Sequence, residues 1–294
     1  MKTGYRVPFL VLLALGLVAV ASPLNGTYAL QTGEPQTRGY LNDTTVAGDP
    51  LEQHLDLWMT PASGGGTIRQ YTVEMTKRLH MIIVSDDFTH FLHIHPVLGA
   101  DGHFTIDARF PAPALYHIYG DAEPAGVGQQ VFRFDVPVAD GRAVGERTLA
   151  PTGRGVAAGP YTVTLSTTTV SAGKDTDIRV HVLRDGQPAR DLHPYLGALA
   201  HAVFLNARDL TYVHVHPAAL NADGSSSMAG MDMSSMGGMS GMGGMDMAPL
   251  PDTATTSPDM LLHVVLREPG TSKLWLQFRG GTELHVAAFV ITAT

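Results

Sequence analysis

One histidine pattern occurs twice in the chain. Each copy has a histidine, a second one thirteen positions later, a third two positions after that, and then a proline. The segments read LHMIIVSDDFTHFLHIHP (79–96) and AHAVFLNARDLTYVHVHP (200–217). Neutral imidazole is a good ligand for copper and zinc, so three converging imidazoles would form a metal site. The candidate ligands are His80, His93, His95, His201, His214 and His216.

The spacing within each copy predicts a β-hairpin. Side chains alternate between the faces of a strand, so His93 and His95 share a face, and segment 81–84 is the expected partner strand. A two-residue turn at 86–87 would place His80 opposite His93, whereas a loop wider by two residues would place it opposite His95. Three imidazoles then converge on one face of the hairpin. The alternative is that the histidines only hydrogen-bond within the fold, but the repetition favours metal binding.

A methionine-rich insertion follows the second copy. Segment 225–258 reads SSSMAGMDMSSMGGMSGMGGMDMAPLPDTATTSP. Its residues between the methionines are too small or too polar to build a core, so we expect a disordered loop. Thioether sulfur is a soft, neutral ligand that prefers Cu(I) and Ag(I), whereas ordinary linkers use Gly, Ser, Pro and charged residues. The candidate ligands are Met228, Met231, Met233, Met236, Met239, Met242, Met245 and Met247.

Composition limits the possible functions. The 294 residues suffice for two domains and include 14 histidines and 13 methionines but no cysteine. A soft-metal site must therefore use imidazole and thioether, and disulfides are excluded. The formal net charge of −8 and the lack of a Lys/Arg cluster argue against a nucleic-acid partner.

The first 21 residues are typical of a secretory signal peptide. Lys2 and Arg6 precede an apolar stretch at 9–20, and 19–21 fits an A-x-A cleavage site, although a second candidate would move the cut to residue 29. The apolar stretch is shorter than the roughly 20 residues that a membrane helix needs. We therefore expect a periplasmic or secreted protein with no membrane span in the mature chain.

Short strand-like segments separated by turn residues predict an all-β fold, with two tandem immunoglobulin-like β-sandwich modules. The expected strands include 67–75, and segment 116–119 is matched with 274–277 of the second module. The expected divisions are a flexible leader at 22–38, module 1 at 39–138, a linker at 139–159, and module 2 at 160–294 with the insertion 225–258.

Several other residues have weaker claims to a role in a metal site. His117, His263 and His285 could supply a fourth ligand, but we expect each to be a solvated or hydrogen-bonded side chain. Asp86 and Asp87 are most simply turn residues. Residues 195–198 are expected to shape the backbone that enters the strand of His201.

The segments LHMIIVSDDFTHFLHIHP, DLHPYLGALAH and YVHVHP resemble secreted bacterial proteins with tandem immunoglobulin-like modules, namely YtkA-like or heavy-metal-binding proteins of copper-handling loci. The resemblance covers most of 40–294. The methionine loop is similar to those of CopC-like carriers and copper-resistance multicopper oxidases. The resemblance implies copper handling in an exported protein. Neither cleavage site leaves an N-terminal histidine, so the N-terminal copper site of CopC-like proteins is not expected.

We therefore expect a copper-binding protein, with silver or zinc as alternative metals, that serves sequestration, delivery or tolerance. Each module would hold one triplet site, the loop would collect Cu(I), and another periplasmic copper protein would be the partner. No catalytic constellation is recognisable, so an enzyme is not expected. The alternatives are a structural or adhesive β-sandwich with incidental histidines and a copper redox enzyme. Segment 212–217 is locally similar to superoxide dismutase, but the chain lacks its cysteines and zinc loop.

Overall fold

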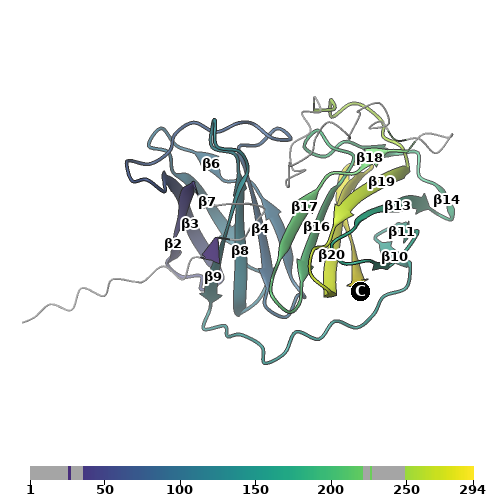
Figure 1. Cartoon of the computed structure of the whole chain (residues 1–294), viewed down its shortest axis with the longest axis horizontal. Helices are drawn as coiled ribbons and strands as arrows, with labels where there is room; N and C mark the ends of the chain where they lie inside the picture. Colours follow the sequence, from purple (N-terminus) through teal and green to yellow (C-terminus); the bar gives the residue numbers. More distant parts are fainter. Residues whose placement is uncertain (1–25, 28–35, 221–225, 227–248) are drawn as a thin grey trace, which may run out of the picture.

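The computed structural model describes residues 26–27, 36–220, 226 and 249–294 (Figure 1). Over these residues the regular structure consists of strands, which confirms the expected all-β fold. None of these residues forms a helix that is long and apolar enough to span a membrane. The proposed signal peptide and the eight methionines of the insertion lie outside the described residues.

Module 1 is a sandwich of two antiparallel sheets. The apolar residues on their inner faces, such as Leu55, Ile83 and Phe132, form its core. The outer sheet contains β2 (Thr37–Thr45), β3 (Glu52–Pro61), β7 (Phe104–Arg109) and β6 (Val97–Leu98), in that order. The inner sheet contains β1 (Gly26–Thr27), β9 (Gln130–Val138), β8 (Ala114–Ala122), β4 (Leu79–Ser85) and β5 (Phe91–Ile94).

Module 2 is also a sandwich of two sheets, with one parallel strand pair in its inner sheet, around its own core, which includes Val180, Phe204 and Phe289. Its outer sheet contains β10 (Gly155–Ala158), β11 (Tyr161–Leu165), β13 (Asp175–Arg184), β19 (Asp259–Val265) and β18 (Ala218–Ala219), with β14 (Gln187–Pro188) beside β13. Its inner sheet contains β12 (Thr169–Val170), β21 (Glu283–Ala293), β20 (Gly270–Gly280), β16 (His201–Asn206) and β17 (Tyr212–Val215), with β15 (Leu192–His193) beside β20.

Three sequence expectations need correction. Segment 67–75 forms no strand: Tyr71 makes an isolated bridge to Pro124, and the segment ends in a turn that the Glu74–Lys77 bridge closes, with Met75 and Thr76 at positive φ angles. Strands β1 and β2 begin within the expected leader 22–38, and β10 lies within the expected linker 139–159. Glycine lowers strand propensity in all three of these strands, but pairing with a neighbouring strand outweighs it.

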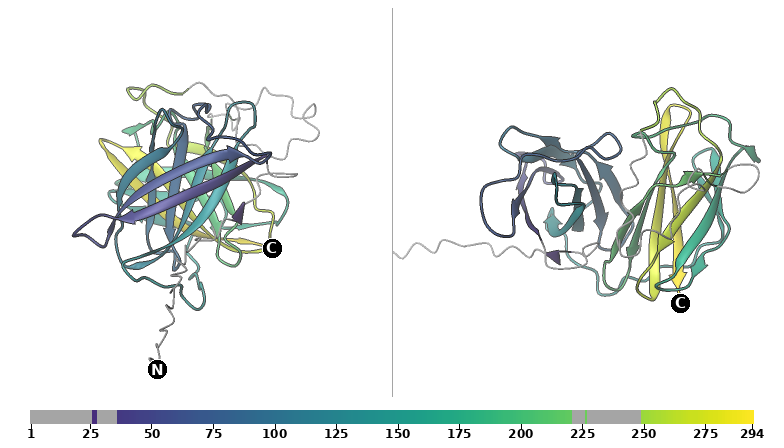
Figure 2. Two further views of the ribbon diagram at one scale, coloured as in Figure 1. Left: turned by 90° about the vertical axis from the view of Figure 1, so that its left-hand side faces the viewer. Right: turned by 45° about the horizontal axis from the view of Figure 1, so that its top comes forward.

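The two inner sheets pack against each other, which makes the molecule four sheets deep (Figures 1 and 2). Alternate residues of β4 show this: Met81 and Ile83 belong to the core of module 1, whereas Ile82 and Val84 face module 2. All seven residues of β4 are buried for this reason. The layer between the modules consists of Ile82, Val84, Phe88, Tyr119, Val131, Val203, Leu205, Leu210, Tyr212 and Trp275.

The interface has approximate two-fold symmetry. Tyr119 of β8 stacks on Tyr212 of β17, with ring centroids 4.8 Å apart. Trp275 of β20 stacks on Phe91 of β5 at 5.2 Å. Because β20 is the repeat of β8 and β5 is the repeat of β17, the second contact is the first with the modules exchanged. Phe91 and Tyr212 lie two residues before His93 and His214, so both stacks lie beside the histidine triplets.

The segment between the modules is anchored by a buried carboxylate. Asp86 accepts hydrogen bonds from the backbone N–H of Val144 and Nε of Arg147, both at 2.7 Å, and from Nε2 of His117 at 2.8 Å. Arg147 also donates to the carbonyl of Ala207 in module 2. Asp86 is therefore more than the turn residue that its sequence context suggests, because it ties the linker to module 1.

Candidate metal centre at the module interface

Strand register determines how the histidines of each copy meet. Ile82 pairs with His93. Continued by two residues along each strand, the same register places His80 opposite His95. In the second copy, pairing of Ala202 with Val215 places His201 opposite His216. This is the wider of the two registers that the sequence permits. The loop is wider because Asp87 bonds Ser85 and Thr89, and the backbone N–H of Ser85 already bonds the carbonyl of His90.

The first triplet, His80, His93 and His95, brings three ring nitrogens together. His80 Nδ1 lies 3.0 Å from His93 Nε2, and His95 Nε2 lies 3.1 Å from the same atom. Metal–nitrogen bonds of about 2.0–2.1 Å at tetrahedral angles separate ligand nitrogens by about 3.3 Å. The triplet is therefore close to the spacing that a metal ion requires.

The second triplet, His201, His214 and His216, has a related arrangement, in which the shared atom is Nδ1 of the first histidine instead of Nε2 of the second. His201 Nδ1 lies 3.2 Å from His214 Nε2 and 3.0 Å from His216 Nε2. In each copy the first histidine presents Nδ1, and the other two present Nε2. The repetition thus extends from sequence spacing to the identity of the converging atoms.

Two backbone carbonyls fix the tautomer of the first histidine in each copy. His80 Nε2 donates to the carbonyl of Glu74 at 3.1 Å, and His201 Nε2 donates to that of Tyr195 at 3.0 Å. Each carbonyl belongs to a tight turn, 74–77 or 195–198, closed by a bridge between its end residues. A carbonyl only accepts, so Nε2 carries the proton and Nδ1 is left with a lone pair. The expected role of residues 195–198 in shaping the entry to this strand is confirmed.

The second histidine in each copy is oriented from the opposite module. His93 Nδ1 donates to Oε1 of Gln277 at 2.9 Å, and His214 Nδ1 lies 3.4 Å from Oδ2 of Asp121. Nε2 of each ring therefore also presents a lone pair to the centre. In the His80–His93 and His201–His214 pairs, two lone pairs face each other with no proton between them. Such an arrangement is favourable when a cation lies between the nitrogens.

The two triplets form one six-histidine centre rather than two separate sites. The ring centroids of His93 and His201 lie 5.0 Å apart, and those of His80 and His214 lie 5.4 Å apart. The ligand nitrogens of His93, His201 and His214 all lie within 4.8 Å of one another. The sequence places one triplet in each module but does not show that the face that carries each triplet is covered by the other module.

Burial keeps the imidazoles neutral. It lowers the pKa of His80 to about 4 and is the main reason why the pKa values of His95 and His216 fall to about 3, with the nearby His80 ring as a further cause. Burial, followed by neighbouring imidazoles, places the pKa values of His93, His201 and His214 well below the usual 6.5. All six imidazole rings are therefore neutral at pH 7, which is the form that binds a metal ion. Two groups of three could hold a metal ion: His80, His93 and His95, and His93, His201 and His214.

Asp121 and Gln277 are site residues that the sequence analysis missed. Asp121 is buried and accepts hydrogen bonds from Gln129 Nε2 at 2.7 Å and Tyr212 Oη at 3.2 Å, and burial raises its pKa to about 6. The register pairs Asp121 with His80 and Gln277 with His201. The sequence analysis matches 116–119 with 274–277, which is the right pair of strands but is shifted by two residues. This shift hides the equivalence of Asp121 and Gln277.

Three other histidines were considered as fourth ligands. His117 bridges Asp86 and Asp135, and His263 bonds Asp177, so both form the ordinary hydrogen bonds that we expected. His285 packs against the rings of Tyr161 and Phe278. Among the residues that the structure describes, none of the three belongs to a cluster that could hold a metal.

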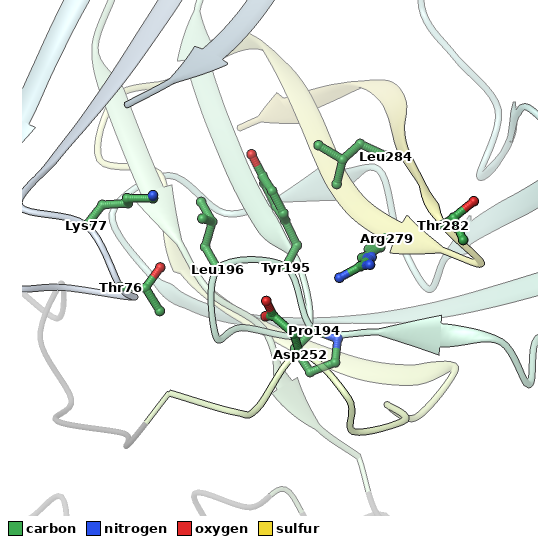
Figure 3. A pocket seen from close by; sticks show the side chains of 9 residues that line it. All are labelled: Thr76, Lys77, Pro194, Tyr195, Leu196, Asp252, Arg279, Thr282 and Leu284. Atoms are coloured by element: carbon green, nitrogen blue, oxygen red, sulfur yellow. The ribbon is translucent and has the colours of Figure 1, made fainter. Parts of the chain in front are cut away.

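A cavity of about 440 Å³ lies beside the centre at the module junction (Figure 3). The Tyr195 ring belongs to its wall and also meets the rings of His93 and His201 edge-on, with centroids 6.1 and 5.3 Å away. Lys77 and Arg279 lie on opposite sides of Tyr195 in Figure 3. The remaining lining residues are Thr76, Pro194, Leu196, Asp252, Thr282 and Leu284.

The described ends of the methionine-rich insertion lie close to the second triplet in the chain and in space. The insertion begins after β18, which follows His216 and Pro217 directly. It returns at Leu250, whose backbone N–H donates to the carbonyl of Gly197 at 2.8 Å. Gly197 belongs to the turn whose Tyr195 carbonyl fixes His201, so both ends of the insertion are attached beside this triplet.

Sequence comparison identifies a family. Residues 39–140 and 156–294 match the model of a family described as a Domain of unknown function (DUF8832). The chain belongs to this family. The DUF8832 match includes both modules, and therefore all six histidines, and leaves out most of the linker. No curated protein has a significantly similar sequence.

Chains of solved structures match this chain, one of them only weakly. The weak match is Escherichia coli alpha-2-macroglobulin activated by porcine elastase, with 12% sequence identity and a TM-score of 0.21. The match covers 88% of the DUF8832 chain, which spans only 20% of that protein's length. A likeness this low carries no functional argument.

Proposed function

We propose that the protein binds copper at the six-histidine centre, with one ion in each triplet. The observation that carries this proposal is the set of fixed tautomers: the Nδ1 lone pairs of His80 and His201 face the Nε2 lone pairs of His93 and His214 at 3.0 and 3.2 Å. Structural histidines would share a proton across such a distance. Metal ligands instead direct their lone pairs at the position of the ion.

The choice of copper rests on the donor set of the whole chain. Imidazole is a good ligand for Cu(I), Cu(II) and Zn²⁺ alike, so the six histidines alone do not select among these ions. The eight methionines of the insertion supply thioethers, which favour Cu(I) and Ag(I), and the chain has no cysteine to offer a competing thiolate. Copper is the metal that suits both donor types, with silver and zinc as the alternatives.

The proposed role is sequestration or delivery of copper outside the cytoplasm. The methionine segment would capture Cu(I) and transfer it to the second triplet, beside which both of its described ends are attached. Residues 1–21 would direct export, and another exported copper protein would exchange the metal. Four of the six rings are buried, and only His95 and His216 are partly exposed, which suits retention of an ion better than rapid turnover.

The test is a titration with Cu(I) and Cu(II) of the full-length mature protein and of two variants. One variant lacks 227–248 but keeps Ser226 and residues 249–258, which contact module 2. The other replaces the eight methionines by leucine, so that the length is kept and only the sulfur is lost. We expect two Cu(II) per chain in all three proteins and a loss of Cu(I) capacity in both variants.

The competing functions give different results in the same experiment. A structural or adhesive protein with incidental histidines would show no saturable copper binding in any of the three proteins. A superoxide dismutase-like enzyme would show turnover of superoxide that is lost on substitution His214→Ala. Stoichiometric binding without turnover supports the carrier.

A further inference from the structure

The two triplets differ in the side chain that reaches them from the opposite module. Gln277 of β20 contacts His93, and Asp121 of β8 contacts His214. The two contacting residues occupy equivalent positions of the repeat, because each is paired across the sheet with the first histidine of its own module. Each module therefore orients a ligand of the other module's triplet, with a neutral amide in one case and a carboxylate in the other.

The carboxylate brings charge as well as orientation. Among the residues placed by the structure, Asp121 is the one whose carboxylate contacts a histidine of the centre, and its side chain is 1% exposed. Gln129 and Tyr212 donate to it from two sides, which stabilises the anion. A buried charge acts on a nearby ion more strongly than an exposed one, because the surrounding dielectric is low. A divalent ion gains more from this field than a monovalent ion.

We propose that Asp121 and Gln277 are positioning residues that make the triplets inequivalent, so that the second triplet prefers Cu(II) and the first prefers Cu(I). This inference rests on the proposed copper binding. A carboxylate behind a ligating histidine increases the basicity of the ring, which strengthens its bond to the more highly charged ion. The amide of Gln277 holds the His93 ring in place without adding charge to the first triplet.

Exchange of the two groups by isosteric substitution tests the proposal. Asp121→Asn removes the charge, and Gln277→Glu adds one at the equivalent position, with little change in volume. Each is combined with loss of one partly exposed ligand, His95→Ala or His216→Ala, so that a single intact triplet remains to be measured. The readouts are Cu(II) affinity, the Cu(II)/Cu(I) midpoint potential and the Cu(II) electron paramagnetic resonance (EPR) spectrum.

Asp121→Asn should weaken Cu(II) binding at the second triplet roughly ten- to a hundredfold, as is typical for loss of a group behind a ligand, and leave Cu(I) binding nearly unchanged. Each tenfold loss confined to Cu(II) raises the midpoint potential by about 59 mV. Gln277→Glu should lower the potential of the first triplet. Neither substitution should alter the triplet that its residue does not contact.

The proposal is overturned if both substitutions change thermal stability but leave the potentials and spectra of both triplets as they were. It is also overturned if the triplets have equal potentials before any substitution. If Asp121→Asn fails to fold, Gln277→Glu still decides the matter, because an unchanged first triplet would contradict the role of charge. Failure of copper to bind the unsubstituted protein at all would instead refute the proposed function.

Discussion

The rings of His93 and His201 lie 5.0 Å apart between centroids, although they belong to different modules. Two copper ions bound in the two triplets would therefore lie within several ångströms of each other. We predict that a chain loaded with two Cu(II) gives a broadened or weakened EPR signal, because the two unpaired electrons interact. The variant His95→Ala, which loses one partly exposed ligand of the first triplet, should bind one Cu(II) tightly at the second triplet and give an ordinary mononuclear spectrum. Two additive mononuclear signals in the fully loaded protein would refute the shared centre.

His93 should matter more than its neighbour His95. His93 belongs to two possible donor groups, one with His80 and His95 and one with His201 and His214. We predict that His93→Ala weakens the binding of both ions, whereas His95→Ala weakens one ion alone. Isothermal titration of the two variants gives the comparison directly. Equal effects of the two substitutions would mean that the triplets act independently.

The metal-free protein should lose stability as the pH falls from about 6.5 to 4. Burial lowers the pKa values of all six histidines in the folded state, so the unfolded chain binds more protons over this range, and stability decreases as the pH decreases. Burial raises the pKa of Glu74 to about 8 and that of Asp121 to about 6, which acts in the opposite direction. Two carboxyl groups offset only part of the effect of six imidazoles.

Urea unfolding of the metal-free protein at pH 7, 6 and 5 measures this dependence. The same series with saturating copper is the control, since a bound ion stabilises the folded state by about 2.7 kcal/mol at a hundred times its dissociation constant. A stability of the metal-free protein that is constant or rises toward pH 5 would contradict the burial of neutral histidines.

The two tryptophans allow the module interface to be tested. Trp275 is 3% exposed and stacks on Phe91 of the other module, whereas Trp58 stacks on Tyr40 on the outer sheet of module 1. We predict that Trp275→Ala lowers the free energy of unfolding by about 3–5 kcal/mol, the usual result of removing a buried tryptophan. It should also weaken copper binding, because the two triplets lose their fixed spacing. Trp58→Ala should leave copper affinity unchanged, and chemical denaturation with copper titration measures both effects.

The chemistry of the site was more predictable than its assembly. The spacing of His80, His93 and His95 predicts their shared face, because alternation along a strand and hairpin pairing are local rules. It cannot say what covers that face, since packing of one module on the other depends on surfaces far apart in the chain. The sequence holds one clue to this covering layer. The run MIIV at 81–84 is apolar on both faces, and such a strand requires a second layer to cover its outer side.

The residues that orient the ligands were hidden for a different reason. Asp121 and Gln277 are residues of different types, so comparison of the two repeats does not reveal them as equivalent. Each also contacts a histidine of the other module, which the sequence does not show. The sequence context of Asp86 likewise indicates only a turn residue, because Ser-Asp-Asp is a common turn sequence. Its burial follows from the linker, which returns over it and brings Arg147 within reach.

The buried pair at Asp86 should contribute far more to stability than an exposed pair of the same kind. The side chains of Asp86 and His117 are each 1% exposed, whereas those of Asp107 and His54 are 62% and 48% exposed. Removal of one partner from a buried pair leaves the other uncompensated, so we predict that Asp86→Asn costs about 3–5 kcal/mol. Asp107→Asn should cost at most about 1 kcal/mol, because water screens that pair. Urea denaturation at pH 7 measures both, and equal small losses would mean that Asp86 does not anchor the linker.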